Sequence, residues 1–71
     1  MGETIERGVV WVGGEWRVWV DGKGAGMWEV TAMDGAVEKA RWKVGCNGMS
    51  CAASVGIDWV LGEMKKSEKV A

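Results

Sequence analysis

Residues 9–20 read VVWVGGEWRVWV, and this stretch decides the fold class. Valine and tryptophan dominate both halves of it, and β-branched and aromatic side chains favour strands. Gly13-Gly14 separates the halves, and a glycine pair readily adopts the positive φ angles of a tight hairpin turn. The stretch therefore predicts a β-hairpin with strands at 8–12 and 15–20.

The predicted turn also assigns side chains to faces, because successive strand residues point to opposite sides of a sheet. With a two-residue turn at Gly13-Gly14, one face of the hairpin becomes the expected core face. Its members are Val9, Trp11, Trp16, Val18 and Val20. Arg17 and Trp19 fall on the opposite face, so the apolar pattern is mixed.

The chain beyond this hairpin contains a further predicted strand and a segment that fits either a strand or a helix. Residues 27–33 predict a third strand, with Trp28, Val30 and Ala32 on one face. The segment 36–44 fits two structures. Its residues include good helix formers that suit a helix, but they also alternate in polarity as a strand would.

A helix is expected near the C-terminus. Ile57, Val60, Leu61 and Met64 fall at helical spacing after the small, polar residues 46–54. Asp58 would then lie in the first helical turn, where a negative charge is favourable. The predicted fold class is therefore α+β, an antiparallel β-sheet of hairpins with one C-terminal helix.

Composition excludes several function classes. The 71 residues make one small domain at most, and nine basic against ten acidic residues give a net charge of −1, so nucleic-acid binding is not expected. The chain has no His, which removes imidazole metal sites and His-based catalysis, and no acid–base pair of carboxylates stands out. We expect a protein that is not an enzyme.

The targeting features are equally sparse. No apolar run approaches 18 residues, so no membrane span is predicted, and the N-terminus is too polar for a signal peptide. The expected location is the cytoplasm. There the two cysteines, Cys46 and Cys51, are expected to stay reduced.

One motif points to a chemistry. Gly48-Met49-Ser50-Cys51 places a thiol in a Gly/Ser loop just before the predicted helix. A helix N-terminus favours the thiolate form of cysteine, and thiolates select soft metal ions such as Cu(I).

With this motif in its centre, the segment from about 40 to 71 resembles half of a heavy-metal-associated domain, the module of copper chaperones and copper-transporting P-type ATPases. That family has a strand, a G-M-[ST]-C-x-x-C loop and a helix. The resemblance implies half of a ferredoxin-like module, and it favours a strand at 39–45. It divides the chain into a Trp/Gly-rich β-hairpin region, 1–38, and a partial strand-loop-helix segment, 39–71.

The resemblance also implies a function, namely binding or transfer of a soft ion such as Cu(I), with a metal-transport protein as a partner. Cys51 stands where the family has its first thiol and is the expected main ligand. The second motif cysteine is missing, with Ser54 at its place, so Cys46 is the expected auxiliary ligand, brought close by a mobile Gly48 loop. Met49 is expected to fill the core under the loop.

Other interpretations remain open at this stage. Cys51 fits a packing role as a small hydrophobe, and the Cys46–Cys51 pair also fits a redox disulfide. The rival function is a Trp-rich β-sheet interaction or structural module with no metal role. An unpaired sheet edge would also allow a homodimer.

Overall fold

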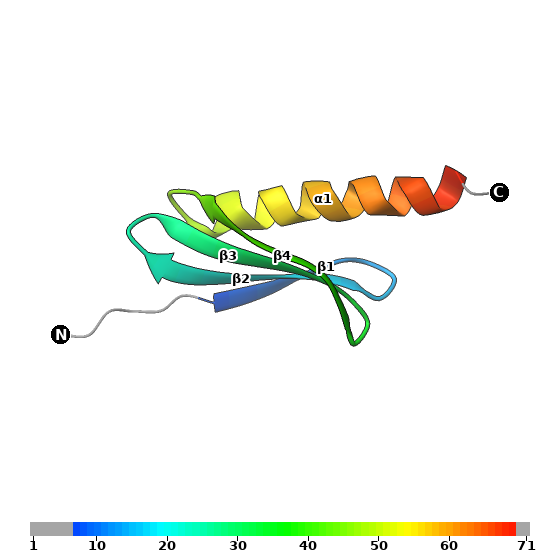
Figure 1. Ribbon diagram of the computed structural model, residues 1–71, viewed down its shortest axis with the longest axis horizontal. Helices are drawn as coiled ribbons and strands as arrows, with labels where there is room; N and C mark the ends of the chain where they lie inside the picture. Colours follow the sequence, from blue (N-terminus) through cyan, green and yellow to red (C-terminus); the bar gives the residue numbers. More distant parts are fainter. Residues whose placement is uncertain (1–6, 70–71) are drawn as a thin grey trace.

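The computed structural model describes residues 7–69, with side chains described as far as Lys66. Its elements are, in chain order, β1 (Arg7–Gly13), β2 (Trp16–Gly24), β3 (Met27–Asp34), β4 (Val37–Gly45) and α1 (Met49–Lys69). The strands form one antiparallel sheet in the order β1-β2-β3-β4, and α1 lies across one face of it (Figure 1). The predicted α+β class, hairpins followed by one C-terminal helix, is confirmed. The ferredoxin-like resemblance remains a prediction.

Every hairpin combines a tight turn with a bulge close to it. Gly14 and Gly35 each open a turn with a positive φ, +58° and +63°, which glycine adopts without a steric penalty. Near each turn, one strand contains an extra residue that the partner strand does not match; these residues are Val12, Lys23 and Lys39. Bulges increase the local twist of a sheet, so they shape all the hairpins alike.

The bulge at Val12 overturns the predicted register of the first hairpin. Trp11 lies opposite Arg17, whereas a two-residue turn at Gly13-Gly14 would place it opposite Trp16. Because one extra residue exchanges the two faces of a strand, Val9 and Trp11 point away from the helix and are 42% and 63% exposed. Val10 packs against the core in their place. The predicted core positions of Val9 and Trp11 are therefore wrong.

From Val37 onward the segment 36–44 lies in the strand β4, as the resemblance favoured, and the helical alternative is wrong. β4 pairs with β3 so that Ala32 faces Ala40 and Val30 faces Trp42. The charged residues between these positions, Lys39, Arg41 and Lys43, are exposed as predicted. Alternation of apolar and charged residues outweighs helix propensity here, because β4 has a strand to pair with and a helix to cover its apolar side.

Most of the core is made of small side chains, with Trp28 of β3 as a large exception at 7% exposure. Val18, Val20 and Val30 of the sheet and Val60 of α1 are its largest fully buried residues. Gly56 of α1 lies directly over the valines. A Cβ atom built on Gly56 would sit 2.9 Å from Val30 Cγ1 and still closer to Val18 Cγ1, so glycine allows the helix to approach the sheet this closely.

The helix begins earlier than predicted, and of its predicted apolar side, Ile57, Val60 and Met64 lie in or against the core whereas Leu61 does not. It starts at Met49, so Asp58 lies in its middle and not in its first turn. The stripe of α1 that meets the sheet consists of Ala52, Ala53, Gly56 and Val60. Leu61, expected in the core, is 44% exposed, because it lies about 100° around the helix from Val60.

A cluster of three tryptophans lies between α1 and the face of the sheet that α1 covers, here called the covered face. Trp59 of α1 lies 6.1 Å from Trp16 of β2 and 5.8 Å from Trp42 of β4, measured between ring centroids. Aromatic pairs at such separations stabilise by about 0.5–1.5 kcal/mol beyond the area they bury. The cluster therefore fastens α1 to strands on both sides of β3.

Candidate functional site

Cys46 follows the last residue of β4 and is held in place by the sheet. Its backbone N–H donates a hydrogen bond of 2.9 Å to the carbonyl oxygen of Gly26, next to the start of β3. This bond continues the β3–β4 ladder by one more residue. The Cys46 side chain is only 9% exposed and belongs to the hydrophobic core.

Cys51 lies in the first turn of α1. The carbonyl oxygen of Gly48 accepts a bond of 3.3 Å from the N–H of Ala52, which makes Gly48 the N-cap residue and Cys51 the third residue of the helix. The Cys51 side chain is exposed. The thiol of Cys51 therefore lies at the N-terminal end of the helix, accessible to solvent.

The structure brings the two sequence-predicted site residues together. The Sγ atoms of Cys46 and Cys51 are 2.6 Å apart, in hydrogen-bond contact, and both cysteines are free. The hydrogen bond with Cys51, followed by desolvation, raises the pKa of the Cys46 thiol above its ordinary value of 9.0. The site thus holds one buried thiol that resists ionisation and one exposed thiol at a helix N-terminus.

The other residues of the motif do not add ligands to this pair. Ser54 is an exposed helical residue one turn beyond Cys51. Met49 packs against the core, and its sulfur would lie 2.8 Å from a Cβ atom built on Gly8 of β1, which fits the expected role as core filler. Among the side chains of residues 7–66, no group of three or more His, Cys, Asp or Glu is arranged to hold a metal ion.

The pair fits a soft ion only in a two-coordinate arrangement. A metal–thiolate bond of about 2.3 Å, the zinc value, lets two sulfurs stand up to twice that distance apart around one ion. The present 2.6 Å contact must therefore open to admit a metal. Cys46 is fixed by the core and the ladder, so the exposed Cys51 side chain is the one with room to move.

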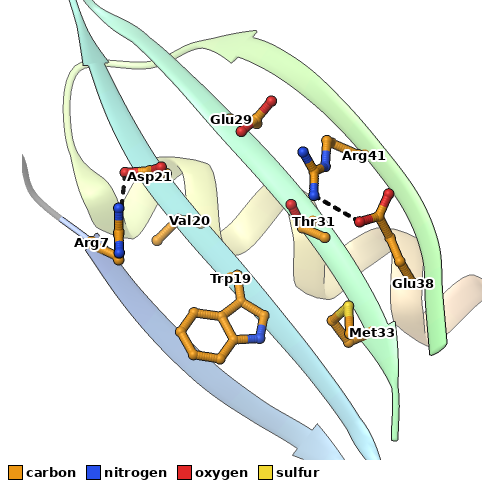
Figure 2. A pocket seen from close by; sticks show the side chains of 9 residues that line it. All are labelled: Arg7, Trp19, Val20, Asp21, Glu29, Thr31, Met33, Glu38 and Arg41. Atoms are coloured by element: carbon orange, nitrogen blue, oxygen red, sulfur yellow. Dashed lines mark hydrogen bonds and ion pairs between the residues drawn. The ribbon is translucent and has the colours of Figure 1, made fainter. Parts of the chain in front are cut away.

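A second feature lies on the opposite side of the sheet and was not predicted from the sequence. The face of the sheet away from α1, here called the open face, carries a hollow of about 390 Å³ (Figure 2). Its lining comes from all the strands and comprises Arg7, Trp19, Val20, Asp21, Glu29, Thr31, Met33, Glu38 and Arg41. Alternation of Trp19, Glu29 and Thr31 with the core valines along β2 and β3 was the available clue.

Charges of both signs meet on the open face. Arg7 lies 3.6 Å from Asp21, and Arg41 donates a 2.7 Å hydrogen bond to Glu38 (Figure 2). Exposed ion pairs of this kind contribute about 0–1 kcal/mol each, so they balance the charge of the face more than they stabilise the fold.

Arg17 connects the open face to the hairpin turns. Its guanidinium carbon lies 5.0 Å from the centroid of the Trp11 ring, a cation–π contact. Its Nη2 donates a 2.9 Å bond to the carbonyl oxygen of Gly35. The exposed Trp11 ring is therefore held in place on the face.

In the part of the chain that the structure describes, no helix is both long enough and apolar enough to cross a membrane. Comparisons with protein-family models, with curated proteins and with solved structures returned no match.

Proposed function

We propose that this protein binds a soft monovalent metal ion of the Cu(I) type through Cys46 and Cys51 and hands it on as cargo. The observation that carries the proposal is the contact between the two sulfur atoms, 2.6 Å apart at the N-terminus of α1. Thiolates are the ligands that Cu(I) prefers. No further side chain is required, because the ion is held at low coordination number.

The difference in burial between the two thiols supports transfer as well as binding. Cys46 is fixed in the core, whereas Cys51 is exposed and open to a thiol of another protein. A partner that carries metal-binding cysteines, such as a metal-transport protein, would take the ion by ligand exchange at Cys51. A compartment that keeps thiols reduced, such as the cytoplasm, suits this role.

Titration of the reduced protein with Cu(I) against a chromophoric chelator tests the proposal. We expect the wild type to withdraw one Cu(I) per chain from the chelator, and the double variant Cys46→Ser/Cys51→Ser to withdraw none. Met49→Leu is the matched control, because it removes a nearby sulfur that belongs to the core and should leave Cu(I) binding unchanged. Equal competition by the wild type and the double variant would end the proposal.

Ser54→Cys tests the origin of the site. Residues three apart on a helix are neighbours, so a thiol at this exposed position stands next to Cys51. We expect this variant to compete for Cu(I) more strongly than the wild type. Unchanged competition would mean that the loop lacks the geometry of the heavy-metal-associated domain.

A second candidate function rests on the open face. Val9, Trp11 and Trp19 are exposed together there, and large apolar side chains in one patch mark interaction sites. Basic and acidic residues are interspersed on the face, where Arg7 pairs with Asp21, Lys23 with Glu29 and Arg41 with Glu38. Because each patch offers both signs of charge beside its apolar side chains, the partner that it fits is a second molecule of this chain.

Sedimentation equilibrium separates this homodimer from a monomer. We expect the wild type to self-associate, and Trp11→Ser to weaken the association at least tenfold. Leu61→Ser is the control, since Leu61 is also an exposed apolar residue but lies on α1. A wild type that stays monomeric at high concentration would exclude the dimer.

A further inference from the structure

We propose that Cys46 and Cys51 form a site of reversible redox modification, closing an intramolecular disulfide by exchange with a small-molecule disulfide of the glutathione class. The inference goes beyond metal binding and does not require it. It concerns the reduced, metal-free protein and the covalent state of its two sulfur atoms.

The first argument is distance. The two Sγ atoms lie 2.6 Å apart, and both thiols are free. A disulfide bond is about 2.05 Å long, so the sulfur atoms need to approach by only about 0.5 Å. The fold therefore holds the two atoms close to bonding distance before any oxidant arrives.

The second argument is the way the fold holds this pair. The N–H of Cys46 is bonded to Gly26 at the end of the β3–β4 ladder, and its side chain lies in the core. Cys51 is fixed to the first turn of α1, whose N-cap is Gly48. Since the loop between them spans only residues 47–50, neither thiol can move far from the other while the chain is folded.

The third argument is exposure, which sets the order of the reaction. An external disulfide reaches Cys51, because that side chain is exposed, whereas Cys46 is only 9% exposed. Cys51 is therefore the attacking thiol. Cys46, adjacent but shielded, is the resolving thiol.

The reaction balances as two successive exchanges. The Cys51 thiol loses its proton to solvent, and the thiolate attacks one sulfur of the oxidised glutathione, whose S–S bond breaks. A Cys51–glutathione mixed disulfide forms, and one glutathione thiolate leaves and takes up a proton. Cys46 then loses its proton and attacks Cys51 Sγ, which releases the second glutathione thiolate. The protein dithiol is oxidised, and one glutathione disulfide is reduced to two glutathione thiols.

The test is incubation of the reduced, metal-free protein with excess oxidised glutathione, followed by intact-mass measurement and thiol counting. We expect the wild type to lose the mass of two hydrogen atoms and both free thiols, with no glutathione retained. Cys46→Ala keeps a small apolar residue in the core and should instead accumulate a stable adduct with one glutathione on Cys51. Cys51→Ser should remain unmodified, because Cys46 is shielded. Dithiothreitol should restore both thiols of the wild type.

Two results would overturn the inference. One is a wild type that retains glutathione as the Cys46→Ala variant does, which would show that Cys46 does not resolve the adduct. The other is a wild type that keeps both thiols free while Cys46→Ala forms its adduct. Because no metal is present in this experiment and no oxidant in the Cu(I) titration, failure of one proposal is distinguishable from failure of the other.

Discussion

The covered face and the open face of the sheet are built from alternate residues of the same strands, but they contain different kinds of side chain. Along β2, Val18 and Val20 point to α1 and are fully buried, while Arg17, Trp19 and Asp21 point the other way. Where Gly56 lies over Val18 and Val30, the covered face is limited to small residues because the helix lies so close; the tryptophans of this face lie elsewhere on it. The open face has no such limit and accepts tryptophan, arginine and carboxylates.

The two faces should also differ in how much a substitution changes the stability of the protein. On the covered face, each side chain is surrounded by fixed neighbours, so a change in volume or polarity has a direct cost. On the open face, side chains are in contact with water and with each other. Most substitutions there should change the free energy of unfolding only slightly. Matched substitutions on the two faces can test this.

The largest effect is expected from a hydroxyl placed under the helix. Val18→Thr keeps the shape of the side chain but buries a polar group among Val30, Gly56 and other apolar neighbours, which costs about 2 kcal/mol of unfolding free energy. Val9→Thr makes the same change on the open face and should alter stability by less than about 0.5 kcal/mol. Urea denaturation of both variants gives the comparison, and equal losses would mean that the two faces do not differ in packing.

Two glycines of α1 extend the comparison to the helix. Gly56→Ala places a methyl group against Val18 and Val30, an overpacking that costs about 2 kcal/mol and outweighs the gain in helix propensity of about 1 kcal/mol. Gly62 has no atom within 4 Å of its Cβ position, so Gly62→Ala should stabilise the protein by up to about 1 kcal/mol. Thermal unfolding should shift in opposite directions for the two variants; a rise in both would mean that the helix does not need glycine at position 56.

The smallest effect is a pH dependence on the covered side. Folding raises the pKa of Cys46 above 9.0, so the folded chain holds this proton more tightly than the unfolded chain does. The stabilisation is complete below about pH 9 and is lost as the pH rises through the higher pKa of the folded state. Denaturation at pH 8 and at pH 10 should therefore show a smaller alkaline loss for Cys46→Ala than for the wild type. An identical loss in both proteins would contradict the shift.

Local pattern was sufficient for every element of the fold except β4, whose segment fitted a helix as well as a strand. The Val/Trp runs, the glycine turns and the spacing of the C-terminal apolar residues predicted the hairpins, the third strand and the helix. Pattern failed at the bulges, because an inserted residue such as Val12 has no signature in sequence and yet reverses the faces of β1. It also failed at the start of α1, where Ser50, Cys51 and Ala52 resemble a loop in composition but are helical.

The candidate site was predictable only in part. The two cysteines and the helix N-terminus were visible in the sequence, and an approach of Cys46 to Cys51 was anticipated. The burial of one thiol and the exposure of the other depend on the ladder bond to Gly26 and on the position of α1, which are long-range features. The hollow on the open face was missed for the same reason, since it depends on the register of strands that are distant in the chain.

The sequence by itself determined the types of all elements except β4, their order and the presence of two thiols near a helix start, because these depend on residue preferences over a few positions. Only the tertiary structure decided which valines are buried, why Gly56 is required and how Cys46 and Cys51 meet. Those outcomes depend on strand register and on the distance between helix and sheet. Both are determined by packing between residues far apart in the sequence, where a single extra residue or a single methyl group changes the result.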